Sequence, residues 1–319
     1  MPKPLRGLAI LAGVAAAWVA GHALLRPAGA QLTRITVPIA RLPQALSGLT
    51  VLVISDLHVN SPKSRALDAL DQLAGLRPDV LVAAGDLAEA GRWVSYVARR
   101  LAAIAPVFGS FAVWGNHDHF SWPEPGEPAW LGETARPLPA MRAALEQAGV
   151  HLLENAVARL TIRGAPLQVV GLNDVRAAPD DVERTFADTD GSMTTLVVVH
   201  SPDGAFELGT HRVDLVVCGH THGGQIVPPM IGALRTATRC RLPKAHGLMH
   251  IDGRPVVVSA GIGTVGVPFR FGVPSEAVLI RLIRPDAAPA EGRAAVPAQG
   301  STVDARTAGP PPGHAPLVS

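Results

Sequence analysis

The stretch VDLVVCGHTHGGQ (213–225) sets a valine-rich apolar run directly before two histidines and two glycines. A short apolar run of this kind is typical of a buried strand, and the polar group that follows marks its end. Four other apolar runs repeat the pattern and lead into DLH (56–58), GD (85–86), GNHD (115–118) and His200. Strands that each deliver Asp, Asn or His at the carboxyl end predict a site along one edge of a sheet.

The regions between these runs indicate an α/β fold, because short β-branched runs alternate with helical stretches. The expected strands lie within 49–56, 79–86, 107–116, 195–200 and 213–220. The expected helices lie around 64–76 and 93–103. The runs are apolar along their whole length, so we expect the strands to be buried in a sheet covered on both faces.

Composition excludes several classes of protein. Lys plus Arg is 28 and Asp plus Glu is 26, so a net charge of +2 gives no support to bulk nucleic-acid binding. Hydrophobic residues make up 48% of the chain, which excludes wholesale disorder. The two cysteines, Cys218 and Cys240, form no CxxC motif, which rules out a disulfide scaffold and a thiolate zinc site.

The chain of 319 residues divides into three expected parts. Residues 1–30 are an N-terminal membrane anchor or signal segment, and 31–284 form one large α/β domain that carries the site. Residues 285–319 are rich in proline and alanine and contain no aromatic residue, so we expect a disordered tail.

The N-terminal segment contains the apolar run GLAILAGVAAAWVAGHALL (7–25). Such a helix is just long enough to cross a hydrocarbon core of ~30 Å, so we expect a single-pass anchor in the cell membrane. Ala28-Gly29-Ala30 also fits a signal-peptide cleavage site, and a buried core helix is a third reading. Basic residues flank both ends of the run, which leaves the side of the catalytic domain undetermined.

The polar residues at the strand ends have the chemistry of a metal site. Asp56 and His58 are two positions apart, as are His220 and His222, so each pair points to one side of an extended segment. Glycine precedes three of the polar residues and allows a sharp turn off the strand. Oxygen and imidazole ligands without a thiolate suit Mn, Fe, Zn or Mg. Seven ligands are too many for one tetrahedral ion and suit two ions that share a carboxylate. The seven are Asp56, His58, Asp86, Asn116, His200, His220 and His222.

In this order, the five blocks resemble the calcineurin-like metallophosphoesterase superfamily over about residues 49–284. GHTHGGQI (219–226), SAGIGTVGVPFRFGVPSE (259–276) and the apolar N-terminus look like its membrane-anchored bacterial branch. Some members of that branch cleave UDP-2,3-diacylglucosamine. The fold that the resemblance implies is two packed mixed β-sheets flanked by helices.

The resemblance also implies a role for each site residue. It implies two divalent ions (Mn, Fe or Zn), with Asp86 as the bridging ligand and a bridging hydroxide that attacks phosphorus. His117 faces the scissile phosphate, and Asp118 orients it. The only tyrosine, Tyr96, lies in an expected helix, which excludes a tyrosinate–iron site. The implied ligands are Asp56, His58 and His222 for one ion, and Asn116, His200 and His220 for the other.

Residues that select the substrate are less clearly marked. Trp122 begins a proline-rich loop that fits either a lid or an ordinary connection. Arg239 could bind an anionic headgroup or belong to a solvated basic face. Arg270 could contact phosphate or form a structural pair. We expect a monomer that hydrolyses a small-molecule or lipid-linked phosphoester or pyrophosphate at the membrane. The alternatives are a broad envelope phosphodiesterase or phosphomonoesterase, and a catalytically idle metal-binding scaffold; a nuclease fits the near-neutral charge less well.

Overall fold

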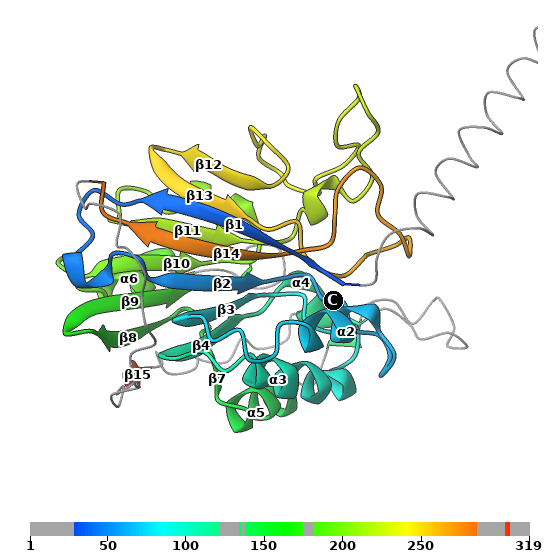
Figure 1. Cartoon of the computed structure of the whole chain (residues 1–319), viewed down its shortest axis with the longest axis horizontal. Helices are drawn as coiled ribbons and strands as arrows, with labels where there is room; N and C mark the ends of the chain where they lie inside the picture. Colours follow the sequence, from blue (N-terminus) through cyan, green and yellow to red (C-terminus); the bar gives the residue numbers. More distant parts are fainter. Residues whose placement is uncertain (1–28, 122–133, 136–137, 175–180, 286–303, 307–319) are drawn as a thin grey trace, which may run out of the picture.

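The computed structural model of the chain describes residues 29–121, 134–135, 138–174, 181–285 and 304–306 (Figure 1). Its centre is a six-stranded mixed sheet in the order β1-β14-β2-β3-β4-β7. Strands β2, β3, β4 and β7 run parallel, and β14 lies antiparallel to β2 and parallel to β1. The strands are β1 (Gln31–Pro38), β14 (Glu276–Ile283), β2 (Thr50–Ile54), β3 (Val80–Ala84), β4 (Gly109–Val113) and β7 (Val150–Leu152).

A second mixed sheet packs against the first and has the order β12-β13-β11-β10-β9-β8-β15. Strands β13, β11, β10 and β9 run parallel, whereas β12, β8 and β15 are antiparallel to their neighbours. The strands are β12 (Gly247–Ile251), β13 (Arg254–Val258), β11 (Leu215–Cys218), β10 (Thr194–Val198), β9 (Ala165–Gly171), β8 (Ala156–Ile162) and β15 (Asp304–Arg306). The two sheets form the layered architecture that the resemblance implied.

Helices cover the outer faces of the sheets, as Figure 1 shows most clearly for α2, α3 and α5 below the first sheet. The α-helices are α2 (Arg65–Asp71), α3 (Val94–Ala103), α4 (Asn116–His119), α5 (Leu138–Gln147) and α6 (Val182–Ala187). The 3-10 helices are η1 (Gln44–Leu46), η2 (Gly91–Trp93), η4 (Pro202–Phe206) and η5 (His222–Gly224), and β5 (Phe120–Ser121) pairs with β6 (Thr134–Ala135). Helix α2 begins where Ser64 accepts a hydrogen bond from the amide of Ala66, a normal N-cap arrangement.

The continuous apolar runs are explained by burial on both faces of the first sheet. In β2, Val51 and Val53 pack into the core between the two sheets, while Leu52 and Ile54 pack into the core beneath the helices. Successive side chains of a strand point to opposite faces, so a strand covered on both sides needs apolar residues at every position. The seven elements expected from sequence are all present, and each end lies within five residues of its expected position.

The two ends of the chain fall largely outside the described residues. The predicted anchor or signal segment lies there, and within the described part no helix combines the length and apolar character needed to cross a membrane. Most of the predicted disordered tail also lies outside. Its described strand, Asp304–Arg306, differs from that prediction, because it pairs antiparallel with β8 at the edge of the second sheet.

Candidate metal centre

The five predicted strand ends meet at one edge of the two-sheet body. Asp56 and His58 follow β2, Asp86 follows β3, and Asn116 and His117 begin α4 just after β4. From the second sheet, His200 follows β10, and His220 and His222 follow β11. Ligand atoms within 4.8 Å of one another define three candidate metal clusters among the described residues, one formed by His58, Glu89 and His117 and two formed by predicted ligands alone. The latter two are Asp56, His58 and His222, and Asp86, His200 and His220.

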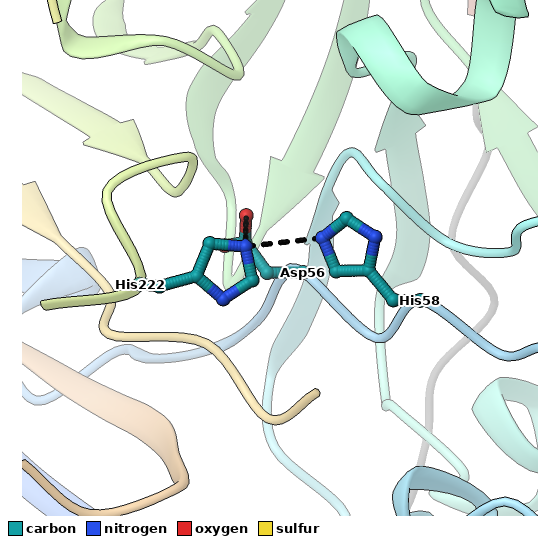
Figure 2. Close-up of side chains that lie close together, drawn as sticks. All are labelled: Asp56, His58 and His222. Atoms are coloured by element: carbon teal, nitrogen blue, oxygen red, sulfur yellow. Dashed lines mark hydrogen bonds and ion pairs between the residues drawn. The ribbon is translucent and has the colours of Figure 1, made fainter. Parts of the chain in front are cut away.

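The first cluster is buried and closely packed (Figure 2). Nε2 of His58 lies 3.0 Å from Nε2 of His222, and Oδ1 of Asp56 lies 3.5 Å from the same His222 nitrogen. Two imidazole nitrogens and a carboxylate oxygen thus converge on one small volume. This is a suitable donor set for a divalent cation such as zinc, iron or manganese.

The second cluster has the same character. Nε2 of His200 lies 3.2 Å from Oδ2 of Asp86 and 3.2 Å from Nδ1 of His220. Oδ1 of Asn116 is buried and has no hydrogen-bond partner among the described residues. A buried polar oxygen without a partner is costly, and a cation ligated by that oxygen would remove the cost.

Asp86 joins the two clusters through a single oxygen. Its Oδ2 lies 3.5 Å from Nε2 of His58 and 3.2 Å from Nε2 of His200, so it faces both groups. The other oxygen, Oδ1, accepts a hydrogen bond of 2.8 Å from the amide of His117. Burial by itself raises the pKa of Asp86, but the imidazoles of His200 and His58 outweigh it and hold the pKa well below its usual value. The carboxylate is therefore charged at neutral pH and fits the bridging position.

Three histidines of the candidate clusters have hydrogen-bond acceptors behind their rings. Nδ1 of His58 lies 2.5 Å from Oε1 of Glu89, and Nδ1 of His200 lies 2.7 Å from the carbonyl oxygen of Ala84. Nε2 of His220 lies 3.2 Å from the carbonyl oxygen of Ala237. An acceptor at the rear nitrogen keeps the proton there, so the lone pair of the other nitrogen points into the centre.

The backbone at the centre differs from the extended segments that the sequence predicted for the paired residues. Asp56 and His58 do not lie on an extended segment, and neither do His220 and His222. Five of the seven predicted ligands instead have φ in the left-handed region, which non-glycine residues occupy at an energetic cost. The φ values are 51° for Asp56, 45° for His58, 54° for Asp86, 70° for His220 and 52° for His222.

The glycines before the ligands serve two different purposes. Gly85 has φ of 85°, which fits the predicted sharp turn. Gly115 and Gly219 are not in the left-handed region. A β-carbon at Gly115 would overlap Oδ1 of Asp86, and one at Gly219 would overlap Oδ2 of Asp56. These two glycines let the chain lie directly against a ligand carboxylate.

The residues around His117 differ from expectation. Oε1 of Glu89 lies 3.4 Å from Nδ1 of His117, so this carboxylate contacts both His117 and His58. Asp118, expected to orient His117, is fully buried, and its carboxylate accepts hydrogen bonds from the amides of Leu87 and Gly115. Asp118 thereby ties the strand end of β3 to that of β4. Sequence reasoning missed Glu89, although its position three residues after Asp86 in the same loop was a usable signal.

The electrostatics of His117 follow from these neighbours. Burial disfavours the imidazolium form, but contact with Glu89 and the charge of Asp86 more than compensate and raise the pKa of His117. The same contacts hold the pKa of Glu89 well below its usual value, so Glu89 is an anion. By contrast, burial lowers the pKa of His222 to about 3, which keeps this ligand neutral.

The candidate substrate contacts have mixed outcomes. Arg270 is buried behind His222, where its guanidinium donates hydrogen bonds to the carbonyl oxygens of Gly263 and His222 and approaches Nδ1 of His222 at 3.3 Å. Of the two roles expected for Arg270, this placement fits structural pairing, because the described hydrogen bonds of the guanidinium go to the protein itself. Arg239 has an exposed side chain, and its amide donates to the carboxylate of Asp203. Trp122 lies outside the described residues.

Comparison with known proteins agrees with this geometry. The family model described as "Calcineurin-like phosphoesterase" matches residues 49–224, more than half of the chain. An uncharacterized metallophosphoesterase of Bacillus subtilis, YkuE, is 24% identical over 77% of this chain and 83% of its own length. A second one, YkoQ, is 26% identical over 70% of this chain and 80% of its own length. A protein of Danio rerio named "Transmembrane protein with metallophosphoesterase domain" is 27% identical over 76% of this chain and 55% of its own length.

Proposed function

Because the chain belongs to the calcineurin-like phosphoesterase family, we propose that it hydrolyses phosphoesters with the help of two divalent cations, Mn, Fe or Zn. The observation that carries this proposal is the position of Asp86 Oδ2 between the imidazoles of His58 and His200. One charged oxygen shared by two ligand clusters supports a centre for two ions rather than one.

The proposed division of ligands follows the two clusters. Asp56, His58 and His222 hold one ion, and His200, His220 and the unpartnered Oδ1 of Asn116 hold the other. When bound, such a pair of cations neutralises charge on the phosphate and lowers the pKa of water in the site. The carboxylates of Asp56 and Asp86, whose pKa values are lowered in the fold, provide the negative charge that the cations require.

His117 is the proposed proton donor. Glu89 contacts Nδ1, which leaves Nε2 as the ring nitrogen for the oxygen of the leaving group. A raised pKa increases the protonated fraction of the ring near neutral pH, and the protonated ring can deliver a proton as the phosphorus–oxygen bond breaks. We assign Glu89, rather than Asp118, the role of holding the ring in this orientation.

For the substrate we propose a small-molecule or lipid-linked phosphoester at the membrane, with UDP-2,3-diacylglucosamine as the first compound to test. The apolar run at 7–25 supports a membrane location, as does the printed name of the Danio rerio relative. We propose that the protein acts as a monomer. We also propose that it takes no nucleic acid, because the net charge is only +2.

One assay tests these statements together. The purified full chain, loaded with Mn²⁺, is incubated with bis-p-nitrophenyl phosphate, p-nitrophenyl phosphate and UDP-2,3-diacylglucosamine. Hydrolysis of the lipid-linked diphosphate supports the lipid-linked proposal, and hydrolysis of the nitrophenyl esters alone supports a broad envelope phosphoesterase. Protein that holds two cations and hydrolyses none of the three would contradict the proposed hydrolase and favour a metal-binding scaffold.

A further inference from the structure

We propose that the loop that directly follows the metal ligands docks on an anionic membrane surface and sets the metal centre against the lipid headgroups. We call residues 227–246 the docking loop. This inference concerns where the site is presented, and it goes beyond the proposed hydrolysis, because the loop contacts would form whatever bond is cleaved.

The docking loop exposes large apolar side chains at its tip. Met230 is fully exposed, Ile231 is 73% exposed and Leu234 is 61% exposed. Single exposed apolar residues are ordinary, but three within five positions form a local cluster. A neighbouring loop, residues 259–275, connects β13 to β14. Its Val267 is 38% exposed and is the fourth exposed large apolar residue among those described.

The docking loop and the neighbouring loop form one surface. The side-chain amide of Gln225 donates hydrogen bonds to the carbonyl oxygens of Val265 and Val267 and accepts one from the amide of Val265. The amide of Val227 donates to the carbonyl oxygen of Phe271. Both loops project from the same end of the molecule, at the right of Figure 1.

This surface is attached directly to the metal centre. The loop begins after His222, and the carbonyl oxygen of Ala237 within it contacts Nε2 of His220 at 3.2 Å. Thr221, between the two histidines, donates a hydrogen bond of 2.6 Å to the carbonyl oxygen of Ala245. Contact of the loop with a membrane would therefore fix the distance of the centre from that membrane.

The charge of the docking loop identifies its partner. Arg235, Arg239, Arg241 and Lys244 are exposed, and the sequence contains no acidic residue between Asp214 and Asp252. Basic residues near an anionic leaflet contribute about 1 kcal/mol each, and apolar side chains beside them enter the boundary of the acyl chains. An apolar tip flanked by basic residues matches anionic phospholipid better than an apolar protein partner.

The entry of the chain into the fold supports the same orientation. Gln31, the first residue of β1, pairs with Glu276. The amide of Glu276 donates to the carbonyl oxygen of Gly261, and Gly261 lies against Asp56. The start of β1 therefore lies at the edge that carries the metal centre. Only five residues lie between Leu25 and Gln31, so the chain spans at most about 20 Å from one to the other. A membrane that held the apolar run 7–25 would lie close to this edge.

The test uses the full chain reconstituted in vesicles that contain phosphatidylglycerol. An environment-sensitive NBD label is attached to a cysteine introduced by Ile231→Cys. Cys240→Ser removes the other accessible thiol, and Cys218 can stay because it is buried. The control is Ser192→Cys, an exposed position before β10 and thus at the edge opposite His200. We expect a blue-shifted emission at position 231 and at least about twofold stronger quenching by nitroxide lipids than at 192. Vesicles of phosphatidylcholine alone should weaken both signals at 231.

Two results would overturn the inference. One is a label at 231 that aqueous iodide quenches as strongly as the label at 192. The other is shielding that disappears when the protein-to-lipid ratio is lowered, which would show contact between copies of the chain. Hydrolysis of bis-p-nitrophenyl phosphate by the same samples is recorded separately, so loss of the proposed activity is distinguished from loss of docking.

Discussion

The Nε2 atoms of His58 and His222 lie 3.0 Å apart in a buried site, although 164 residues separate them in the chain (Figure 2). At that distance one nitrogen must donate a proton to the other, or both must direct lone pairs at a shared cation. The acceptor Glu89 holds the rear nitrogen of His58, which favours a lone pair toward the centre. The contact therefore supports a metal position between the two rings.

Replacement of Asp86 should empty both halves of the centre. Asp86→Ala removes the oxygen that faces both His58 and His200, so the cation content should fall from about two to fewer than one per chain. Elemental analysis of dialysed protein measures this, and turnover should fall to the detection limit. Asp68→Ala, at an exposed position of α2, is the matched control and should keep both cations. An Asp86→Ala protein with full occupancy would contradict the bridging role.

Replacement of His117 should separate metal binding from turnover. This residue lies in neither of the two proposed ligand sets, although it forms a third cluster with His58 and Glu89, so we expect His117→Ala to retain both cations. Loss of the proton donor should lower kcat by roughly 10²–10⁴-fold. Single-turnover kinetics at matched metal content provide the measurement. Undiminished kcat in this variant would remove His117 from the mechanism.

Replacement of Glu89 should shift the pH dependence of turnover. The Glu89 carboxylate helps to raise the pKa of His117, so Glu89→Gln should lower that pKa. A smaller fraction of His117 would then be protonated above neutral pH, and the alkaline limb of the kcat profile should move to lower pH. Asp118→Asn is the comparison, because the described hydrogen bonds of Asp118 go to backbone amides. A larger alkaline shift in Asp118→Asn than in Glu89→Gln would return the orienting role to Asp118.

Replacement of Arg270 should weaken one metal position selectively. Its guanidinium donates hydrogen bonds to the backbone carbonyl oxygens of His222 and Gly263 and so fixes the segment that carries His222, and loss of such support to a ligand typically costs roughly 10–100-fold in metal affinity. Arg270→Lys keeps the charge but not the several directed hydrogen bonds. The cation held by Asp56, His58 and His222 should therefore titrate at roughly tenfold higher concentration. Isothermal titration with Mn²⁺ measures this, with the melting temperature recorded to detect unfolding. Two unchanged affinities would show that Arg270 acts only in the fold.

Replacement of Gly115 should damage the centre through one methyl group. A β-carbon there overlaps Oδ1 of Asp86, so Gly115→Ala must displace the bridging carboxylate or the chain beside it. Overpacking of this kind costs about 1–3 kcal/mol, and metal content should fall with it. Gly191→Ala has open space around the new carbon and serves as the control in thermal denaturation and elemental analysis. Equal behaviour of the two variants would contradict the close approach at Gly115.

The sequence predicted the strands of the site well, because each buried strand is a continuous apolar run and ends in a polar group. It also predicted that these ends converge, since β2, β3 and β4 are parallel and so are β10 and β11. Pairing of β1 with β14 could not be predicted in the same way, because Gln31 and Glu276 are joined by no local pattern.

The supporting residues of the centre were harder to predict than its ligands. Ala84 and Ala237 act through backbone carbonyl oxygens, which carry no signature in the sequence. The sequence left Arg270 as either a phosphate contact or a structural pair, and only the fold reveals that it donates to the carbonyl oxygens of Gly263 and His222. The left-handed φ of the ligands is also invisible in a sequence, since Asp and His adopt it only where the surrounding structure imposes it.

Anomalous diffraction from crystals of the full chain loaded with Mn²⁺ tests the central claim most directly. We predict two separate peaks, one contacted by Asp56, His58 and His222 and the other by Asn116, His200 and His220. Asp86 should lie between the peaks, which should be roughly 3.5–4 Å apart. A single peak, or two peaks without Asp86 between them, would contradict the two-cation centre.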